Sequence, residues 1–212
     1  MNITVASFSL ILAAPLLLLA AVAVRLSSRG PVIYSQDRVG LERRRSTEDR
    51  RGWDRDEKDR RATNAGGRVF RMHKFRTMYV NGNGGAEKQV WARKDDPRIT
   101  PVGRVLRAFR FDEFPQMVNV LLGEMSIVGP RPEQPEIFRE LRQEISNYPR
   151  RQQVLPGITG LAQVSHRYDQ SLQDVERKLS LDLRYIERVS SAEDLRIMLK
   201  TIPVVLFRKG GL

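Results

Sequence analysis

The sequence contains no cysteine among its 212 residues, which excludes a disulfide scaffold, a thiolate zinc site, a cysteine nucleophile and a lipidated N-terminal cysteine. Histidine occurs only as His73 and His166, which are too few and too far apart in sequence to suggest a histidine metal site. The phosphate-binding P-loop, the glycine-rich dinucleotide turn and the HExxH zinc motif are also missing. The sequence therefore gives no sign of a P-loop NTPase, a Rossmann enzyme or a zinc peptidase.

Charge is absent from the start of the chain: no charged residue precedes Arg25, and 20 of the first 26 residues are apolar. A helix from Ile3 to Val24 would be about 33 Å long, enough to cross a hydrocarbon core of about 30 Å. The rest of the chain is polar, and the whole carries a net charge of +12. We therefore expect a membrane segment at residues 1–26 and one domain at residues 27–212, because a domain typically has about 100–200 residues.

The residues alone leave three interpretations of this N-terminal segment. Ala21-Val22-Ala23 fits a signal-peptide cleavage site, although residues 1–9 carry no lysine or arginine. Alternatively, the basic residues that begin at Arg25 would hold the body in the cytoplasm behind a straight anchor. Pro15 suggests a third arrangement, since it removes a backbone donor and kinks a helix. A helix kinked there could dip into the membrane and return to the same side.

The body is predicted to be mostly helical with a small β element. Strands are expected at 32–34 and 68–78 with a turn at 36–40, and helices at 102–109, 114–122, 133–153, 170–188 and 192–207. The last helix is expected to be amphipathic and interrupted at Pro203. It ends in an apolar and then basic run, which suits a membrane surface and a packed terminal helix equally well. Residues 42–61 carry nine basic and seven acidic side chains and cannot form a core alone. We expect a solvated loop or exposed helix there, with contact to lipid headgroups or a polyanion as the alternative.

The most informative local feature is the heptapeptide at 110–116, which reads RFDEFPQ. Pro115 is favoured in the first turn of a helix, so the predicted helix begins near Asp112 and Glu113. The helix dipole would keep both carboxylates ionised and would also attract a phosphate. With Arg107 close in sequence, the pair could hold Mg²⁺ and a diphosphate. A capping aspartate followed by a first-turn glutamate is the purely structural alternative.

Two further basic features could recognise phosphate. Arg131 lies between Pro130 and Pro132, and such a rigid loop presents a guanidinium suited to bidentate phosphate binding. Lys74 and Arg76 alternate along the predicted strand and would share one face of it. A connector with a surface arginine and a solvated strand face are the corresponding structural interpretations.

Together these segments make the chain resemble the monotopic phosphoglycosyl transferases, a family of bacterial sugar transferases that act on polyprenyl phosphate. The matching stretches keep their order and spacing: GPVIYSQDRVG (30–40), FRMHKFRTM (70–78), residues 96–133, PGITGLAQV (156–164), and the C-terminal stretches KLSLDLRYIERVS and LKTIPVVL. Nearly the whole chain is covered except residues 42–66, which look like a charged insertion.

The resemblance implies a reaction in two steps. Asp112 would attack the β-phosphate of a UDP-sugar, form a phosphosugar-aspartyl intermediate and release UMP. Polyprenyl (undecaprenyl) phosphate would then take the sugar phosphate and become a polyprenyl-diphosphate sugar, as the first membrane step of glycoconjugate or exopolysaccharide synthesis. Glu113 would bind Mg²⁺ and help to orient the phosphates, so Asp112 and Glu113 are expected both as catalytic dyad and as metal site. This chemistry suits a carboxylate, which can split one hard step into two through a covalent intermediate.

The resemblance also assigns contacts with the substrates. Arg107 and Arg131 match family arginines near the phosphates or the nucleotide, Lys74 and Arg76 belong to the KFR segment, and Gln163 and Arg167 match polar positions after the PGITG loop. Departures from the family pattern at Leu155, Leu161 and residues 165–167 fall near the expected nucleotide and sugar region, and they could alter which sugar is accepted.

The fold and location implied by the resemblance are those of a single α/β domain, mostly α with a small β element, on a re-entrant, Pro-kinked membrane helix. Amphipathic helices would lie on the membrane surface, at the cytoplasmic face of the bacterial cell (inner) membrane. Membrane lipid would be a partner, and a homodimer is among the assemblies the family allows. Family members usually have Ser-Pro where this chain has Ala14-Pro15, so the hydroxyl that would re-bond a freed carbonyl is missing. The chain would be a minimal member without additional N-terminal membrane helices.

Two other functions compete with the enzyme. The first is a membrane-tethered basic module that holds nucleic acid or anionic lipid through its charge of +12. Its basic residues are spread along the chain, however, and residues 42–61 are nearly balanced, so nucleic acid is not expected as a partner. The second is a catalytically inert family member that acts as a scaffold. The intact Asp112-Glu113 pair argues against it.

Overall fold

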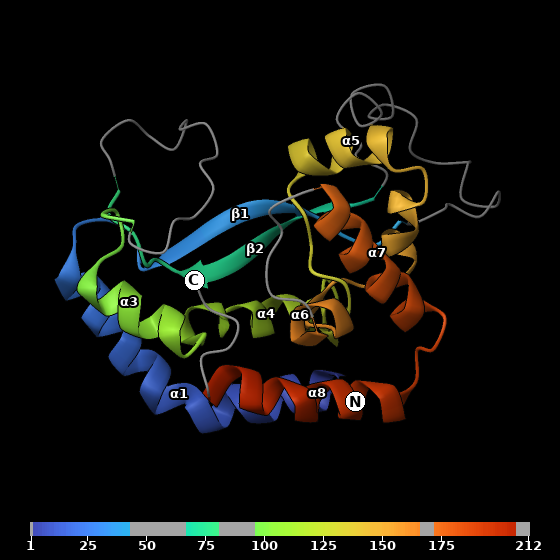
Figure 1. The fold of residues 1–212 in the computed structure, drawn as a ribbon. Coiled ribbons are helices and arrows are strands. Elements are labelled where there is room, and N and C mark those ends of the chain that lie inside the picture. Colours follow the sequence, from blue (N-terminus) through green and yellow to red (C-terminus); the bar gives the residue numbers. More distant parts are fainter. Residues whose placement is uncertain (1, 43–66, 81–95, 166–171, 207–212) are drawn as a thin grey trace, which may run out of the picture.

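The computed structural model describes residues 2–42, 67–80, 96–165 and 172–206 (Figure 1). Its elements in chain order are α1 (Asn2–Ser27), β1 (Ile33–Val39), β2 (Val69–Phe75), α3 (Pro101–Ala108), η2 (Phe111–Glu113), α4 (Gln116–Leu121), β3 (Ser126–Val128), α5 (Pro135–Glu144), η3 (Tyr148–Gln153), β4 (Gly157–Thr159), α6 (Leu161–Ser165), α7 (Leu172–Ile186) and α8 (Ser191–Leu206). The described chain is mostly helical with two small sheets, which confirms the expected secondary-structure content. Nearly all of the expected insertion at 42–66 lies outside the described residues.

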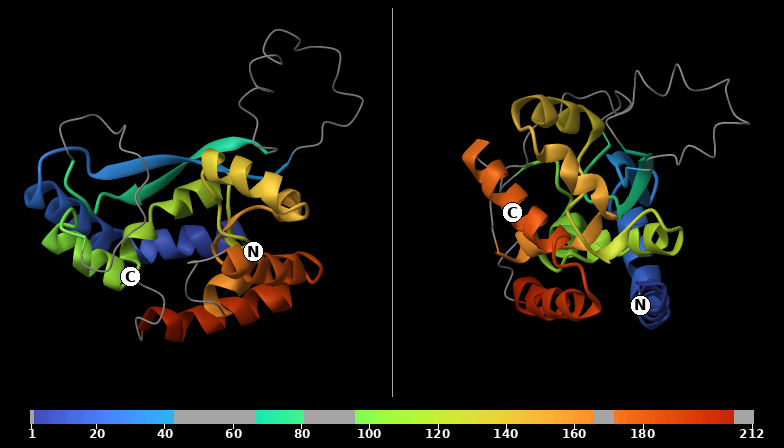
Figure 2. Two further views of the ribbon diagram at one scale, coloured as in Figure 1. Left: turned by 45° about the horizontal axis from the view of Figure 1, so that its top comes forward. Right: turned by 90° about the vertical axis from the view of Figure 1, so that its right-hand side faces the viewer.

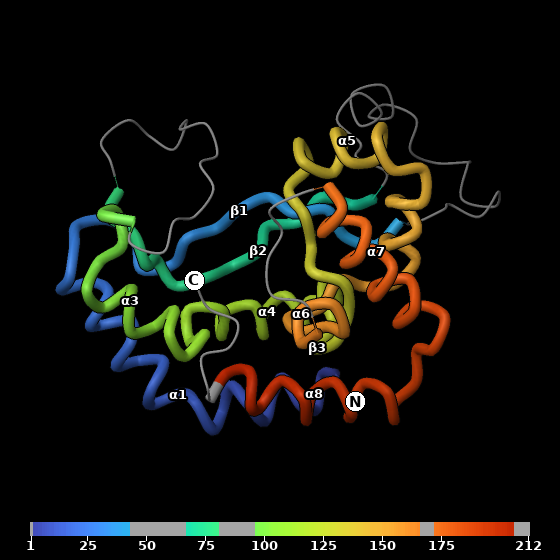
Figure 3. The backbone as a smooth tube through the Cα atoms, in the orientation of Figure 1, coloured from blue at the N-terminus to red at the C-terminus, as the bar shows by residue number. Residues whose placement is uncertain are grey.

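The helix α1 is long and apolar enough to cross a membrane, with a mean hydropathy of 2.5 over its most apolar window. Only 17% of that window is buried, which distinguishes α1 from the core helix of a soluble protein. Figures 1 and 3 show that the path of α1 changes direction along its length. Pro15 lies in its interior, where proline removes one backbone hydrogen bond and favours a bend.

One narrow stripe of α1 faces the rest of the protein. Ala6, Ala13 and Ala20 recur every seven residues and are buried, and the helix packs there against α3, α4 and β3. Small side chains allow the backbones of packed helices to approach closely. The remaining surface of α1 is covered with exposed apolar side chains: Ile3, Phe8, Ile11, Leu12, Leu16, Leu18, Leu19, Val22 and Leu26.

A long antiparallel ribbon is formed by β1 and β2, with a register from Ile33 opposite Phe75 to Val39 opposite Val69. The predicted turn at 36–40 is therefore wrong for most of its length, because residues 36–39 continue the strand and pair with β2. The second predicted strand is confirmed but ends earlier, at Phe75. Beyond it, Met78 forms only an isolated bridge with Ile99.

Each predicted helix has a counterpart in the structure, but one of them is divided, and the short helix α6 was not predicted. The helix expected at 133–153 is divided into α5 and the 3-10 helix η3, and Ile145 between them is extended. Pro149 gives the physical reason, because a proline in a continuous helix would clash with the carbonyl of the residue four positions earlier, which is Ile145. The interruption expected at Pro203 is wrong, because α8 continues through this residue.

The parallel pair of β3 and β4 brings two loops together. Its register places Ser126 opposite Gly157 and Val128 opposite Thr159. A β-carbon added at Gly157 would collide with the backbone of Gly129, so the two backbone segments approach as closely as glycine allows. The PGIT and VGPRP loops predicted from the sequence therefore lie next to each other.

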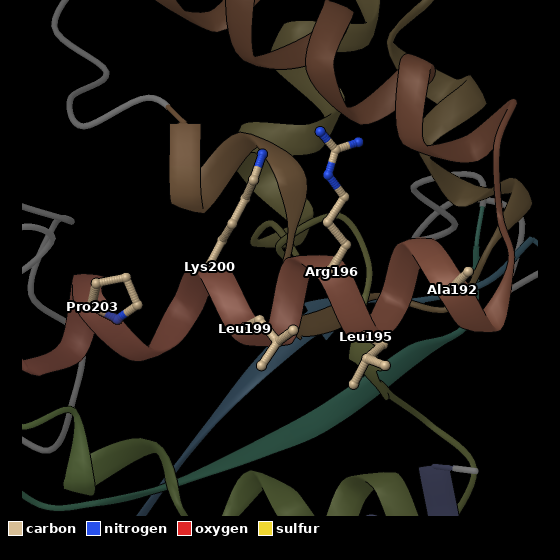
Figure 4. Close-up of a pocket in the computed structure, with 6 residues that line it drawn as sticks. All are labelled: Ala192, Leu195, Arg196, Leu199, Lys200 and Pro203. Carbon is tan, nitrogen blue, oxygen red and sulfur yellow. The ribbon is translucent and has the colours of Figure 1, made fainter.

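The main core lies beside the ribbon and is built by side chains from β2, α4, β3, α6, α7 and α8. Figures 1 and 2 show α1 and α8 along one side of the molecule. On α8, Figure 4 shows Leu195 and Leu199 pointing away from Arg196 and Lys200, and both leucines are more than half exposed. The helix is therefore amphipathic, as predicted: Ile197 packs into the core, whereas Leu195 and Leu199 are exposed.

Asn119 of α4 holds the helix against β2. Its side chain is fully buried, accepts from the backbone N–H of His73 at 3.2 Å, and donates to the carbonyl of Arg71 at 2.8 Å and to Glu124 at 2.8 Å. These contacts fix the part of β2 that carries Lys74.

Replacing Asn119 with alanine is expected to destabilise the protein by about 2 kcal/mol, because two partly buried backbone groups of β2 lose their partner. Urea unfolding in detergent, followed by circular dichroism, measures this change. Val118→Ala, at the exposed neighbouring position, is the control and should change stability by much less. Equal losses for the two variants would contradict the tie between α4 and β2.

Candidate active site

Asp112 and Glu113 lie in the short 3-10 helix η2, between α3 and α4. The turn into η2 is made by Arg110, the only described non-glycine residue with a positive φ, at 53°. The expectation that the pair begins α4 is therefore wrong: α4 starts at Gln116, with Pro115 as its cap. The reason is this left-handed turn, which directs both carboxylates inward. Their residues are 9% and 7% exposed.

Glu113 is surrounded by cations from three parts of the chain. Its Oε1 accepts from Arg131 at 2.8 Å and from Lys74 at 3.1 Å, and its Oε2 lies 3.7 Å from Arg110. Burial alone would raise the pKa of Glu113, but these cations hold its pKa well below the usual range. Glu113 is therefore a fixed negative charge at neutral pH.

Asp112 is the opposite case. Burial and the neighbouring charge of Glu113 raise its pKa, against the attraction of Lys74, Arg107 and Arg131. Among the described residues, no hydrogen bond or ion pair is formed by its carboxylate. The carboxylate of Asp112 is buried, poorly solvated and not engaged by another group. These are the properties of an available nucleophile.

Three of the predicted substrate-binding residues, Lys74, Arg107 and Arg131, lie near the carboxylates, and their role in binding stays a prediction. Lys74 comes from β2, and Arg131 from the loop after β3. Arg107 comes from the last turn of α3, where its Nε donates to the hydroxyl of Thr77 at 2.8 Å. An excess of positive charge therefore surrounds the dyad, which favours binding of a phosphorylated ligand.

Arg76 is not brought to the carboxylates. Its guanidinium donates to the carbonyls of Ser28 at 2.6 Å and of Val24 and Arg29 at 3.1 Å, at the C-terminal end of α1. The last carbonyls of a helix lack partners within it, so a buried cation is well placed there. The predicted common face with Lys74 is wrong because β2 ends at Phe75, between the two.

Of the two remaining predicted residues, Gln163 is not joined to the dyad by any contact in the described ranges. Gln163 lies on α6, where its amide donates to the carbonyl of Ile158 at 3.0 Å and its Oε1 is buried without a partner. Its role in substrate binding stays a prediction. Arg167 lies outside the described residues.

Arg38 is a basic residue that sequence reasoning missed. In the register of β1 and β2, Arg38 lies opposite Phe70 and Tyr34 opposite Lys74, so Arg38 and Lys74 belong to the same face of the ribbon. Its guanidinium donates to the carbonyl of Pro132 at 3.0 Å, while burial and the charge of Arg131 lower its pKa to about 10. The alternation of a strand was the signal that could have placed Arg38 on this face, but residues 36–40 were predicted as a turn.

A divalent cation fits this donor set. No group of three or more histidine, aspartate or glutamate side chains occurs in the described parts of the chain, so a cage built by the protein alone is absent there. Mg²⁺ is usually held by one or two carboxylates and completes its shell with water and substrate phosphates. Asp112 and Glu113 are hard oxygen donors of this kind.

Comparison with known proteins identifies the family of this chain. The profile of the bacterial sugar transferase family matches residues 1–47 and 57–208. The chain belongs to this family. The unmatched residues 48–56 fall within the segment interpreted as an insertion from the sequence.

Curated relatives match the chain over almost its full length. It is 39% identical over its whole length to a UDP-N-acetylgalactosamine-undecaprenyl-phosphate N-acetylgalactosaminephosphotransferase of Aeromonas hydrophila, and covers 44% of that protein. Over 97% of its length it is 36% identical to a UDP-glucose:undecaprenyl-phosphate glucose-1-phosphate transferase of Caulobacter vibrioides, of which it covers 68%. Over 99% it is 34% identical to the exopolysaccharide production protein ExoY of Sinorhizobium fredii, of which it covers 85%. The chain thus spans less than half of the first relative and more of the others.

A further, partly buried carboxylate lies next to the site. Glu133 accepts from Arg151 and from Lys178, each at 3.4 Å. Burial would raise its pKa, but Lys178, Arg151 and other nearby cations lower it to about 2. The ordinary value is about 4.3.

Because this pKa is lowered by folding, Glu133 should stabilise the protein by about 3 kcal/mol above pH 4.3, and this should disappear as the pH falls towards 2. Glu133→Gln is therefore expected to cost stability at pH 7 but little near pH 2.5. Urea unfolding of both proteins across this range measures the difference. A difference that does not change with pH would contradict the lowered pKa.

Proposed function

We propose that this protein transfers a sugar-1-phosphate from a UDP-sugar to polyprenyl (undecaprenyl) phosphate. The observation that carries the proposal is the contrast within the dyad: Glu113 is held by three cations, whereas Asp112 beside it is buried and unengaged. The names of the relatives from Aeromonas and Caulobacter describe the same donor and acceptor classes. An exopolysaccharide or related glycoconjugate pathway fits the name of the Sinorhizobium relative.

In the first step, a carboxylate oxygen of Asp112 attacks the β-phosphorus of the donor. The bond between this phosphorus and the oxygen bridging to the α-phosphate breaks, and UMP leaves with that oxygen. The sugar phosphate is then joined to Asp112 as an acyl phosphate. In the second step, an oxygen of polyprenyl phosphate attacks the same phosphorus and frees the carboxylate. Burial supports this role, because a poorly solvated carboxylate is a stronger nucleophile than a hydrated one.

The cations around the dyad would bind and neutralise the diphosphate. Arg131 and Lys74 are already directed at Glu113, so a donor placed beside it would meet both, with Arg107 next to Asp112. We propose that Asp112 and Glu113 also hold Mg²⁺. When bound, the ion would neutralise charge on the phosphoryl oxygens.

We further propose that α1 is re-entrant and that the body lies on the cytoplasmic face of the membrane. Contacts at both ends of α1 support this. The side chain of Asn2 accepts from the backbone of Ile127 in β3 at 3.4 Å, and Arg76 binds the carbonyls at the other end. A straight helix crossing about 30 Å of hydrocarbon would place its two ends on opposite sides of the bilayer, where one folded domain could not contact both.

Asp112→Asn is expected to lower UMP release from a UDP-sugar by at least about a thousandfold, because an amide cannot act as the nucleophile. The assay uses nanodisc-held protein with Mg²⁺, undecaprenyl phosphate and a panel of UDP-sugars. Intact mass with the donor alone should show a phosphosugar adduct on the wild type only.

Asp37→Asn is the matched control, because Asp37 is an exposed aspartate on β1. It should retain both the UMP release and the adduct of the wild type. Turnover by a folded Asp112→Asn protein would exclude Asp112 as the nucleophile. A folded wild type that binds a donor without turning it over would indicate an inert scaffold.

The absence of cysteine permits a direct test of topology. In intact spheroplasts, Thr4→Cys and Glu144→Cys should both be protected from an impermeant maleimide, and both should react after lysis. Each position is exposed in the fold, one near the start of α1 and one on α5. Labelling of Thr4→Cys alone in intact spheroplasts would show that α1 spans the membrane.

A further inference from the structure

The loop that presents Arg131 is held from two sides by other guanidinium groups. Arg38 of β1 donates to the carbonyl of Pro132 at 3.0 Å, and Arg151 of η3 donates to the carbonyl of Arg131 itself at 3.0 Å. Pro130 and Pro132 restrict the backbone on either side. The position of the Arg131 side chain therefore depends on groups that do not touch the dyad.

Arg151 has the geometry of a fixed anchor. It is 6% exposed, and its Nε donates to Asp182 of α7 at 2.8 Å. One terminal nitrogen donates to the hydroxyl of Tyr148 at 2.7 Å and lies 3.4 Å from Glu133. The other makes the contact with the Arg131 carbonyl. All three nitrogens are thus engaged, and the planar guanidinium fixes the directions of its bonds.

Charge alone does not account for this arrangement. Asp182 and Glu133 could be neutralised by any buried cation, and Lys178 is already 3.4 Å from Glu133. The bond to the backbone of Arg131 is different, because it adds nothing to the neutralisation of the two carboxylates. This bond connects α7 and η3 to the loop that carries Arg131, and the side chain of Arg131 in turn contacts Glu113.

We infer that Arg151 is a positioning residue for the transferase site, which acts through Arg131 by holding its carbonyl. The inference rests on the proposed function. Arg151 lies outside the site, and by holding the Arg131 carbonyl it aligns the Arg131 guanidinium with Glu113 and the donor diphosphate.

The test is a double-mutant cycle between Arg151→Lys and Arg131→Ala. Lysine keeps the charge and can reach Asp182, but its single ammonium cannot also reach the Arg131 carbonyl in the guanidinium geometry. In the otherwise wild-type chain, Arg151→Lys should lower kcat/KM for the UDP-sugar by about tenfold, the size typical of groups that orient a ligand-binding side chain. In the Arg131→Ala chain, the same change should have less than a twofold effect, because the side chain to be aligned is gone.

Arg150→Lys is the matched control, since Arg150 is the preceding residue of η3 and contacts Glu187 at the surface. It should leave kcat/KM unchanged in both backgrounds. Rates are normalised to folded protein, and product is followed by mass spectrometry for long enough to measure the Arg131→Ala chains. An equal loss in both backgrounds, or no loss in either, would overturn the inference. Should Arg151→Lys not fold, Asp182→Asn, which removes the charge that holds the Nε of Arg151, replaces it in the same cycle.

A readout without turnover separates this inference from the proposed function. The amides of Gly157 and Val39 donate to the carbonyls of Pro130 and Glu133, at the two ends of the loop. Their hydrogen exchange should be faster in Arg151→Lys than in Arg150→Lys. Unchanged exchange would show that Arg151 does not hold the loop. A wild type that turns over no UDP-sugar would refute the proposed function alone.

Discussion

The charge of Glu113 has to be neutralised from several directions, because a carboxylate removed from water is costly unless cations replace the solvent. Arg131 and Lys74 meet at one of its oxygens, and Arg110 lies near the other. These cations come from different elements: the ribbon, the loop after β3 and the turn before η2. The fold must therefore assemble correctly before Glu113 can be buried, and this links the stability of the domain to the integrity of the site.

Two of these cations, Lys74 and Arg131, act on Asp112 without contacting it. They are paired with Glu113, so their charge lowers the pKa of Asp112 only from a distance, and its carboxylate makes no hydrogen bond in the described ranges. Two adjacent carboxylates thus have their pKa values moved in opposite directions by their surroundings. One remains a fixed charge and the other is unengaged, which is the division of roles that the proposed two-step phosphoryl transfer would require.

The apolar helix α1 belongs to the same structure. Arg76 follows the strand that carries Lys74 and binds the end of α1, so the ribbon connects the site to this helix. Three small residues let α1 pack closely on α3, α4 and β3, while its other surface is apolar and exposed. A site held against the bilayer in this way would suit an acceptor whose polyprenyl chain stays in the lipid.

The sequence by itself determined the apolar helix with its central proline, most helices and the ribbon's second strand, and it singled out Asp112, Glu113 and Arg131 as candidates for the site. These follow from local spacing, proline positions and family motifs, which the chain displays directly. Tertiary structure alone decided that Lys74 meets Glu113 while Arg76 turns to α1, and that Arg38 and Arg151 hold the loop of Arg131. Such contacts join residues up to 94 positions apart, as for Arg38 and Pro132. Local patterns cannot specify them, because which groups meet depends on how packed elements bring distant backbones together.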